Sequence, residues 1–260
     1  MALTSSQKCE ITHVVCASLD AAEAVWGAHG KELMKTVAKD AAIFERADSQ
    51  PAEILPSRIP LHSLVDGSRP KVANFIALVA DMRQSSNHLL CDISEKRADV
   101  TLLKRVYYET SALLPALEKT LTYEGGAVTE YLGDGILSLF SVDDDDNDES
   151  IRKAFRSAKN CVGDTRGLVN DELNSRYRLP SLDIGVGLSY SKALVQLVGI
   201  PGNMHPKVIG NCVYYASKLS AGINEIYVDE AIRKSWPKSE GGKLNFIKKT
   251  LRSTDGFLVF

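Results

Sequence analysis

The sequence predicts an α/β fold (an α+β sandwich) in which helices pack on one face of a mixed, mostly antiparallel sheet. From residue 72 onward, apolar runs of strand length alternate with longer helical patterns in the order βαββαββαβ. A Gly-Asp-Gly turn separates two of these strands, which indicates a hairpin and therefore antiparallel pairing. The content of 44% hydrophobic and 25% charged residues is that of a globular protein.

The first 70 residues differ in pattern from the remainder. Residues 11–17 form a short, strand-like apolar stretch, and residues 19–45 carry apolar side chains at near-helical spacing. Residues 46–70 contain four prolines, which exclude a long helix. We therefore expect residues 1–70 to form an N-terminal helix and a Pro-rich connector, and residues 71–260 to form the main domain.

The main domain is expected to contain strands and helices of ordinary length. Its clearest strand begins at Leu182, where apolar residues alternate and so share one face of a sheet. We expect strands at 72–82, 127–133, 135–142, 182–188 continuing to 193–198, 225–228 and 257–260, and helices at 97–122, 148–173, 211–221 and 229–235.

Composition argues against several classes of protein. A net charge of −2 gives no electrostatic basis for binding nucleic acid. No apolar run approaches the roughly 20 residues of a membrane span, and residues 1–20 lack a signal-peptide pattern. The five cysteines show no CxxC pairing, which is typical of reduced thiols. The expectation is a cytoplasmic protein.

Two aspartates stand out in this pattern. Asp81 ends the apolar run 72–82, and Asp134 lies in the Gly-Asp-Gly turn between the next two strands. Two carboxylates repel each other unless a cation lies between them, and Mg²⁺ binds few carboxylates together with water and substrate phosphates. If the strands are neighbours, the pair predicts a site for metal-assisted phosphate chemistry. Asp134 alone could equally be an ordinary turn residue.

Four segments around these aspartates resemble the class III nucleotide cyclase domain. They are Ala80–Ser86 (ADMRQSS), Tyr131–Phe140 (YLGDGILSLF), Ile184–Lys192 (IGVGLSYSK) and Val208–Leu219 (VIGNCVYYASKL). They occur in the order found in that family and cover about residues 72–228. The resemblance implies a ferredoxin-like βαββαβ cyclase core.

The resemblance also implies a site and a reaction. Asp81, Asp134 and the backbone carbonyl of Met82 would hold two Mg²⁺ or Mn²⁺ ions. Backbone N–H groups of the next four residues would cradle the triphosphate (Arg83, Gln84, Ser85 and Ser86). A nucleoside triphosphate would become a 3′,5′-cyclic monophosphate and pyrophosphate. The protein would be a homodimer with active sites at the subunit interface, one subunit supplying the metals and the other reading the base.

The sequence departs from the resemblance at the base and transition-state positions. Glu130 and Lys207 stand where adenylate-specific members carry Lys and Asp to read the base. Tyr214 and Lys218 stand where the family carries a catalytic Asn and Arg, and their spacing of four places them on one helical face. By hydrogen-bonding pattern alone, Glu130 and Lys207 exclude no base.

These departures resemble the bacterial antiphage pyrimidine cyclases. That resemblance implies a second-messenger synthase acting on UTP, or next on CTP, with a downstream effector that responds to the cyclic nucleotide. UTP is favoured because an anionic Glu130 can accept a hydrogen bond from N3–H of uracil. The alternatives are an ordinary adenylate or guanylate cyclase and an inert nucleotide-binding module. A diguanylate cyclase is disfavoured because the hairpin reads Leu-Gly-Asp-Gly.

Two further groups of charged residues could contribute. Arg83, Arg105 and Lys192 are candidate ligands for the triphosphate, with Arg58 a weaker one, and the sequence does not rank them. The acidic run 143–149 precedes a predicted helix, so we expect it to cap that helix rather than to bind a cation.

Overall fold

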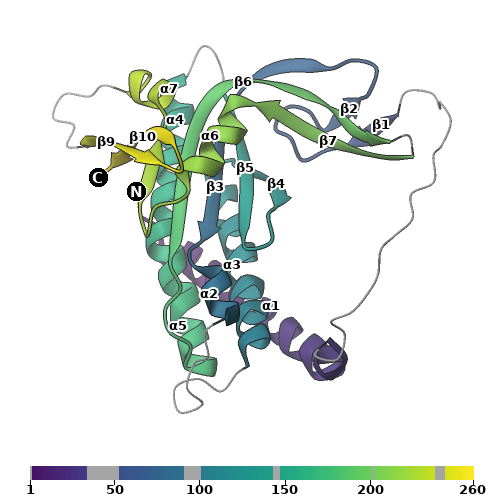
Figure 1. Ribbon diagram of the computed structural model, residues 1–260, viewed down its shortest axis with the longest axis vertical. Helices are drawn as coiled ribbons and strands as arrows, with labels where there is room; N and C mark the ends of the chain where they lie inside the picture. The colour runs from purple at the N-terminus through teal and green to yellow at the C-terminus, as the bar shows by residue number, and fades with distance from the viewer. Residues whose placement is uncertain (1, 34–52, 91–100, 143–146, 201, 238–243) are drawn as a thin grey trace.

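The computed structural model describes residues 2–33, 53–90, 101–142, 147–200, 202–237 and 244–260. Its main sheet has eight strands in the order β4-β5-β3-β6-β8-β10-β9, with β7 paired to β6. Figure 1 shows this sheet with helices packed against it, and the β6–β7 hairpin projecting to one side as an arm. The predicted α/β fold with a mixed sheet is confirmed.

The centre of the sheet is antiparallel. β3 (Lys71–Met82) lies between β5 (Gly135–Ser141) and β6 (Ile184–Ile200) and runs antiparallel to both. β4 (Ala127–Tyr131) pairs with β5 and forms one edge. On the other side, β8 (Ile226–Val228) is parallel to β6, whereas β10 (Thr254–Val259) and β9 (Phe246–Leu251) continue antiparallel.

β3 is buried on both faces, which accounts for its continuous apolar sequence. Ile76, Leu78 and Ala80 join the larger core, which they share with the helices α3 (Leu102–Thr122), α4 (Asn147–Asn160) and α5 (Arg166–Tyr177). Residues of the opposite face, among them Phe75 and Ala77, join a smaller core. The predicted helix 148–173 is α4 and α5 joined by a π-helical segment, Cys161–Thr165.

Helix α6 (Asn211–Leu219) packs on the face opposite to α3, α4 and α5, because its Cys212 and Ala216 belong to the smaller core. The expectation that the helices cover one face is therefore wrong for α6. The reason lies in β6: a Cβ on Gly187 would stand 2.1 Å from the carbonyl oxygen of Ala216. Only a strand without a side chain at this position lets the helix approach so closely.

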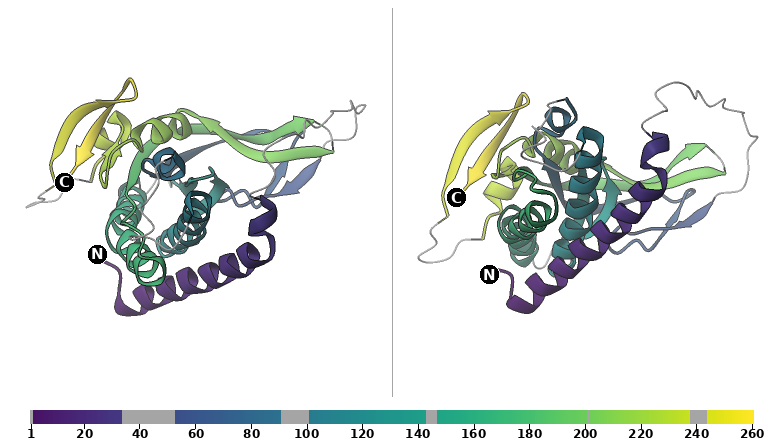
Figure 2. Two further views of the ribbon diagram at one scale, coloured as in Figure 1. Left: turned by 60° about the horizontal axis from the view of Figure 1, so that its bottom comes forward. Right: turned by 90° about the horizontal axis from the view of Figure 1, so that it is seen from below.

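The N-terminal segment is one long helix, α1 (Ser5–Leu33), so the strand expected at 11–17 is wrong. Ile11, Val15 and Leu19 recur every four residues and are fully buried in the larger core. Figure 2 shows α1 crossing α3 and α5. Residues 19–33 of the predicted helix 19–45 are confirmed, and residues 34–45 lie outside the described part of the chain. The division at residue 70 stays a prediction, although α1 shares the main core.

The described part of the connector is non-helical, as its prolines require, but it is more ordered than expected. β1 (Ile54–Pro56) and β2 (Leu64–Asp66) form a separate two-stranded sheet. Val65 packs into the smaller core together with Leu197 of β6 and Val208 of β7 (Asn203–Gly210). The N–H of Gly202, in the β6–β7 turn, also donates to the Glu53 carboxylate, so the connector packs along the β6–β7 arm as far as its tip.

Within the main domain, three short elements were not predicted: α2 (Ser85–Leu90), β7 and β9. α7 (Glu230–Lys234) matches the short helix expected at 229–235. Residues 143–146 of the acidic run lie outside the described residues, but α4 begins at Asn147 with two acids in its first turn, as expected of a helix start. Among the helices described, none is long and apolar enough to cross a membrane.

Candidate functional site

The backbone brings Asp81 and Asp134 together. Register places Asp81 directly opposite Gly135, and the N–H of Met82 donates to the carbonyl oxygen of Asp134 at 3.0 Å. A Cβ on Gly135 would lie 2.6 Å from the carbonyl oxygen of Ala80 and 3.0 Å from Oδ1 of Asp81, so only glycine fits here. The sequence pattern that put the two aspartates at adjoining strand ends is confirmed.

The two carboxylates interact unfavourably. Burial, and next the negative charge of Asp134, raises the pKa of Asp81 to about 6. Arg83 opposes this effect, because its Nη1 donates to Oδ2 of Asp81 at 3.1 Å. Arg252, in the β9–β10 turn, approaches the same oxygen to 3.9 Å and acts in the same direction. Asp81 is 19% exposed, so its charge is only partly screened by water.

This donor set fits a hard divalent cation that takes most of its ligands from elsewhere. The pKa of Asp81 is raised by burial and by the charge of Asp134, and a cation between the two carboxylates would stabilise both in their charged forms. Among the described residues there is no cluster of three or more His, Cys, Asp or Glu side chains that could hold a metal alone. Asp81 and Asp134 are thus the residues that would hold Mg²⁺ or Mn²⁺, with water and substrate oxygens completing the shell. The backbone carbonyl of Met82 stays a predicted ligand.

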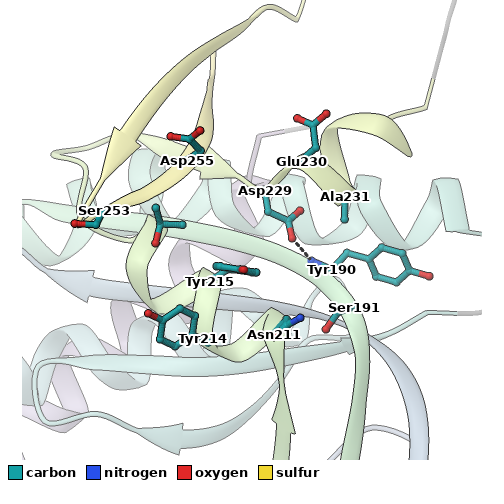
Figure 3. A pocket seen from close by; sticks show the side chains of 11 residues that line it. Tyr190, Ser191, Asn211, Tyr214, Tyr215, Asp229, Glu230, Ala231, Ser253 and Asp255 are labelled. Atoms are coloured by element: carbon teal, nitrogen blue, oxygen red, sulfur yellow. Dashed lines mark hydrogen bonds between the residues drawn. The ribbon is translucent and has the colours of Figure 1, made fainter.

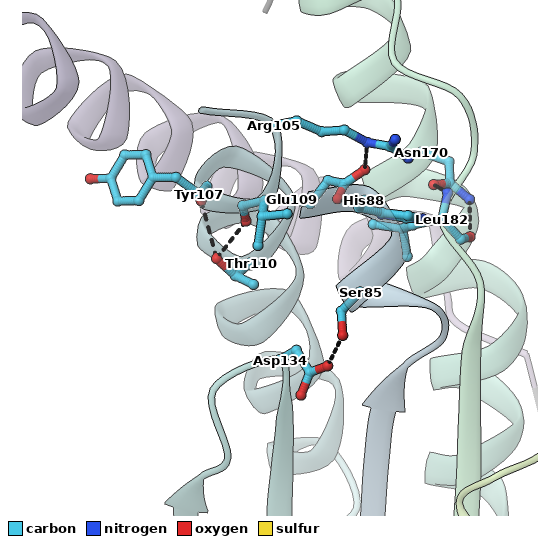
Figure 4. A network of polar contacts seen from close by, with 10 residues as sticks. Ser85, His88, Arg105, Tyr107, Glu109, Thr110, Asp134, Asn170 and Leu182 are labelled. Atoms are coloured by element: carbon cyan, nitrogen blue, oxygen red, sulfur yellow. Dashed lines mark hydrogen bonds and ion pairs between the residues drawn. The ribbon is translucent and has the colours of Figure 1, made fainter. Parts of the chain in front are cut away.

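The segment after Asp81 is used partly for structure. The N–H of Arg83 donates to the carbonyl of Asp183 at 2.7 Å, so the expectation that this N–H cradles phosphate is wrong. The Arg83 guanidinium also donates to the carbonyl of Ser220 at 2.7 Å, which ties β3 to the end of α6. The Ser85 hydroxyl donates to Oδ2 of Asp134 (Figure 4). The predicted phosphate contacts of Gln84 and Ser86 stay predictions.

A buried polar cluster joins α2 to α3 next to the aspartates' segment, and the sequence patterns had not revealed it. Glu109 on α3 is fully buried and accepts from Nε of Arg105 at 2.8 Å. Its other oxygen lies 2.7 Å from Nδ1 of His88 on α2. Arg105 is therefore removed from the candidate triphosphate ligands, because its side chain is buried and paired with Glu109 of the same helix. Charged residues four apart on the apolar face of a predicted helix were the signal that could have revealed the cluster.

The two residues proposed to read the base form an ion pair. Nζ of Lys207 on β7 lies 2.7 Å from Oε2 of Glu130 on β4. β4 forms one edge of the sheet and β7 belongs to the arm, so the contact fastens the arm to that edge. Both side chains are partly exposed and open to a ligand.

The two residues proposed to act at the transition state also lie together. Nζ of Lys218 sits over the ring of Tyr214, 5.4 Å from its centroid, on one face of α6. The Tyr214 side chain is 58% exposed. Among the described residues, no ion pair or hydrogen bond joins either of these residues, or the Glu130–Lys207 pair, to Asp81 or Asp134.

An open cavity of about 620 Å³ lies beside Tyr214, between α6, α7 and the β9–β10 turn (Figure 3). Among the described residues, its lining includes three acids, Asp229, Glu230 and Asp255, and no Lys or Arg. The described lining therefore offers no cationic side chain to an anionic triphosphate. Asp81, Asp134, Glu130 and Lys207 do not line this cavity, so it is not the place where a single chain assembles the predicted site.

Comparison with known proteins identifies the fold. The chain superposes on the guanylyl cyclase Cya2 with a TM-score of 0.56 and 16% identity, over 73% of this chain and 91% of that one. Superposition on the adenylyl cyclase CyaB of P. aeruginosa gives a TM-score of 0.57 and 14% identity, over 74% of this chain and 96% of that one. Superposition on a class III adenylyl cyclase-like ATP-binding protein of Pseudomonas aeruginosa gives a TM-score of 0.58 and 19% identity, over 72% of this chain and 39% of that one.

Sequence relatives point the same way. The chain is 25% identical to an adenylate cyclase of Anabaena cylindrica over 146 residues, 54% of this chain and 28% of that protein. It is 25% identical to the terminal-differentiation-specific adenylate cyclase of Dictyostelium discoideum over 165 residues, which are 64% of this chain and 7% of that protein. The chain thus spans less than a third of either relative's length. No protein-family model matches the sequence. The chain has the fold of the class III adenylate and guanylate cyclases and has homologues among the adenylate cyclases.

Proposed function

We propose that this protein is a metal-dependent nucleotide cyclase, which converts a nucleoside triphosphate to the 3′,5′-cyclic monophosphate and pyrophosphate. The observation that carries the proposal is the convergence of Asp81 and Asp134 at adjoining strand ends, with the pKa of Asp81 raised by burial and by the second carboxylate. The fold and the relatives named above support the same reaction.

The reaction is an internal displacement at the α-phosphorus. The ribose 3′-oxygen loses its proton and bonds to the α-phosphorus, while the bond to the oxygen bridging the β-phosphorus breaks and pyrophosphate leaves. Two Mg²⁺ or Mn²⁺ ions, when bound, would ease loss of the 3′ proton and neutralise phosphate charge. Asp81 and Asp134 would hold these ions. Arg83 and Ser85 fix the orientation of these carboxylates through their hydrogen bonds.

Helix α6 would supply the groups that stabilise the transition state. Lys218 brings a positive charge for the developing charge on the phosphate oxygens, although without the planar fork of arginine. The Tyr214 hydroxyl can donate to a ribose or phosphate oxygen. The cation–π contact between them keeps both groups on one face of α6.

A second copy of the chain would complete the site. The aspartates, the Glu130–Lys207 pair and the Tyr214–Lys218 pair are separate groups in one chain, with no described hydrogen bond or ion pair joining the aspartates to the others. In a symmetric homodimer the aspartates of one subunit would face the other two pairs of its partner, giving two equivalent sites.

Glu130 and Lys207 would read the base. Glu130 can accept from a ring N–H and Lys207 can donate to a carbonyl, which suits the keto bases guanine and uracil. The names of the relatives favour an ordinary adenylate or guanylate cyclase over a pyrimidine cyclase. Glu130 and the sequence resemblance support UTP as the substrate, and the resemblance supports an antiphage role with a downstream effector.

An assay with four nucleotides tests the proposal. Purified protein is incubated with ATP, GTP, CTP or UTP and Mn²⁺, and cyclic monophosphate is measured by mass spectrometry. We expect product from at least one triphosphate and none from Asp81→Asn or Asp134→Asn. Absence of product from all four would refute the proposal, and formation of product by either variant would refute the metal-ligand assignment.

A second candidate is an inert nucleotide-binding module. Tyr214 and Lys218 replace the Asn and Arg expected by resemblance, and one of the similar structures is described as a cyclase-like ATP-binding protein. This candidate predicts saturable binding of a non-hydrolysable triphosphate without turnover of the natural one.

A further inference from the structure

Glu109 takes no part in the chemistry proposed above, yet both of its carboxylate oxygens have partners (Figure 4). Nε of Arg105 donates to Oε1 at 2.8 Å within α3. Nδ1 of His88 lies 2.7 Å from Oε2 and comes from a different element, α2. The Glu109 side chain is fully buried, and that of Arg105 is 6% exposed.

A carboxylate at this position is costly unless it does something an apolar side chain cannot. Removing an ion pair from water costs free energy, and an apolar side chain of similar volume often packs as well or better. Arg105 already balances the charge of Glu109 from within the same helix. The contact with His88 is the one by which Glu109 links α3 to a second element, α2.

His88 lies on the short helix that follows the metal-site strand. α2 begins directly after Gln84, whose φ of 60° turns the chain away from β3. Ser85 and His88 are three residues apart and share a face of α2. Ser85 donates to Asp134, whereas His88 bonds Glu109. One turn of helix thus connects the Asp134 carboxylate to a buried anchor on α3.

We propose that Glu109 and His88 are positioning residues that hold α2, and through Ser85 set the orientation of the Asp134 carboxylate for metal binding. Hydrogen bonds to a ligating carboxylate fix its orientation, and losing such a partner typically weakens metal binding. The proposal rests on the metal site of the proposed function. It assigns no contact with substrate to either residue.

His88→Leu is the main test, because it leaves the Arg105–Glu109 pair intact and so avoids an unpaired buried charge. Binding of Mn²⁺ to the metal-free protein, measured by the free Mn²⁺ signal in electron paramagnetic resonance, should weaken about tenfold. Hydrogen exchange of the α2 amides should become faster. His88→Gln keeps an N–H that can reach Glu109 and should bind Mn²⁺ within about threefold of wild type.

Thr120→Val is the matched control. Thr120 is buried in the same helix, where its hydroxyl donates to the Ala116 carbonyl and contacts the Thr165 hydroxyl, away from α2. The control should lower the melting temperature and leave Mn²⁺ affinity unchanged. Wild-type Mn²⁺ affinity in His88→Leu would overturn the proposal, and so would an equal loss of affinity in Thr120→Val. If wild type makes no cyclic product but His88→Leu still weakens Mn²⁺ binding, the proposed function is refuted and the positioning role is retained.

Discussion

Lys207 and Glu130 form an ion pair of 2.7 Å that fastens the β6–β7 arm to the β4 edge of the sheet. Both side chains are partly exposed, so the pair contributes little to stability, about 0.2–1 kcal/mol. The role proposed for the pair is recognition of the base. A ligand that accepts from Lys207 and donates to Glu130 would replace the bonds that the two side chains make to each other.

Reversing one charge of this pair should change nucleotide selection. Lys207→Glu places two carboxylates together, which removes the donor for a base carbonyl and repels the arm from β4. We expect kcat/KM for the preferred triphosphate to fall about 10-fold or more, since a buried substrate carbonyl would lose its partner. The double variant Glu130→Lys/Lys207→Glu should recover thermal stability but not the original base preference. Recovery of both would show that the pair only holds the arm.

Asp81→Asn should stabilise the metal-free protein at neutral and alkaline pH. The folded carboxyl keeps its proton up to a pKa of about 6, whereas the unfolded chain releases it near pH 4. Between these values the folded state binds more protons, so wild-type stability falls as the pH rises through this window. Above pH 7 the variant should be more stable by up to about 3 kcal/mol.

Urea denaturation in EDTA at pH 4.5 and pH 8 measures this difference, which should be small at the lower pH and larger at the higher one. Asp66→Asn is a control of opposite sign, because hydrogen bonds from Ser68 hold the pKa of Asp66 below its usual range. Added Mn²⁺ should raise the melting temperature of wild type and leave Asp81→Asn unchanged. A variant that is less stable than wild type at pH 8 would contradict the electrostatic account.

Complementation should reveal a shared active site. If one subunit supplies Asp81 and its partner supplies Lys218, then Asp81→Asn and Lys218→Met are each inactive but damage different halves of the site. Random mixing then leaves one intact site in each mixed dimer, and should restore about a quarter of wild-type activity. Gel filtration checks the dimer. Mixtures that stay inactive while the subunits exchange would place both residues in the same half-site.

Shortening a buried side chain of α1 should destabilise the whole domain. Leu19 is fully buried in the main core, so Leu19→Ala should cost about 2–5 kcal/mol in the free energy of unfolding. Leu103→Ala, at an exposed position of α3, is the control and should cost far less. A single denaturation transition for both variants would show that α1 unfolds with the sheet, whereas an early separate transition would support a division near residue 70.

The sequence predicted the central elements well, because their residues have one dominant pattern. Residues 75–80 are apolar throughout since both faces of β3 are buried there, and the glycine-flanked Asp134 produced the expected hairpin. The 11–17 stretch was misread because a short apolar run does not separate strand from helix. Its apolar residues fit the helical period only when followed on to Leu19 and Ala22.

The sequence by itself determined the central strands, the location of Asp81 and Asp134 at strand ends and the four segments that resemble a cyclase, since these depend on local pattern and spacing. Only the tertiary structure decided which face of the sheet α6 covers, that Arg105 is buried and hydrogen-bonded to Glu109, and that Lys207 forms an ion pair with Glu130. These features join residues from separate elements. Their contacts depend on burial and on how a strand, a helix and an arm meet in space, which no local pattern encodes.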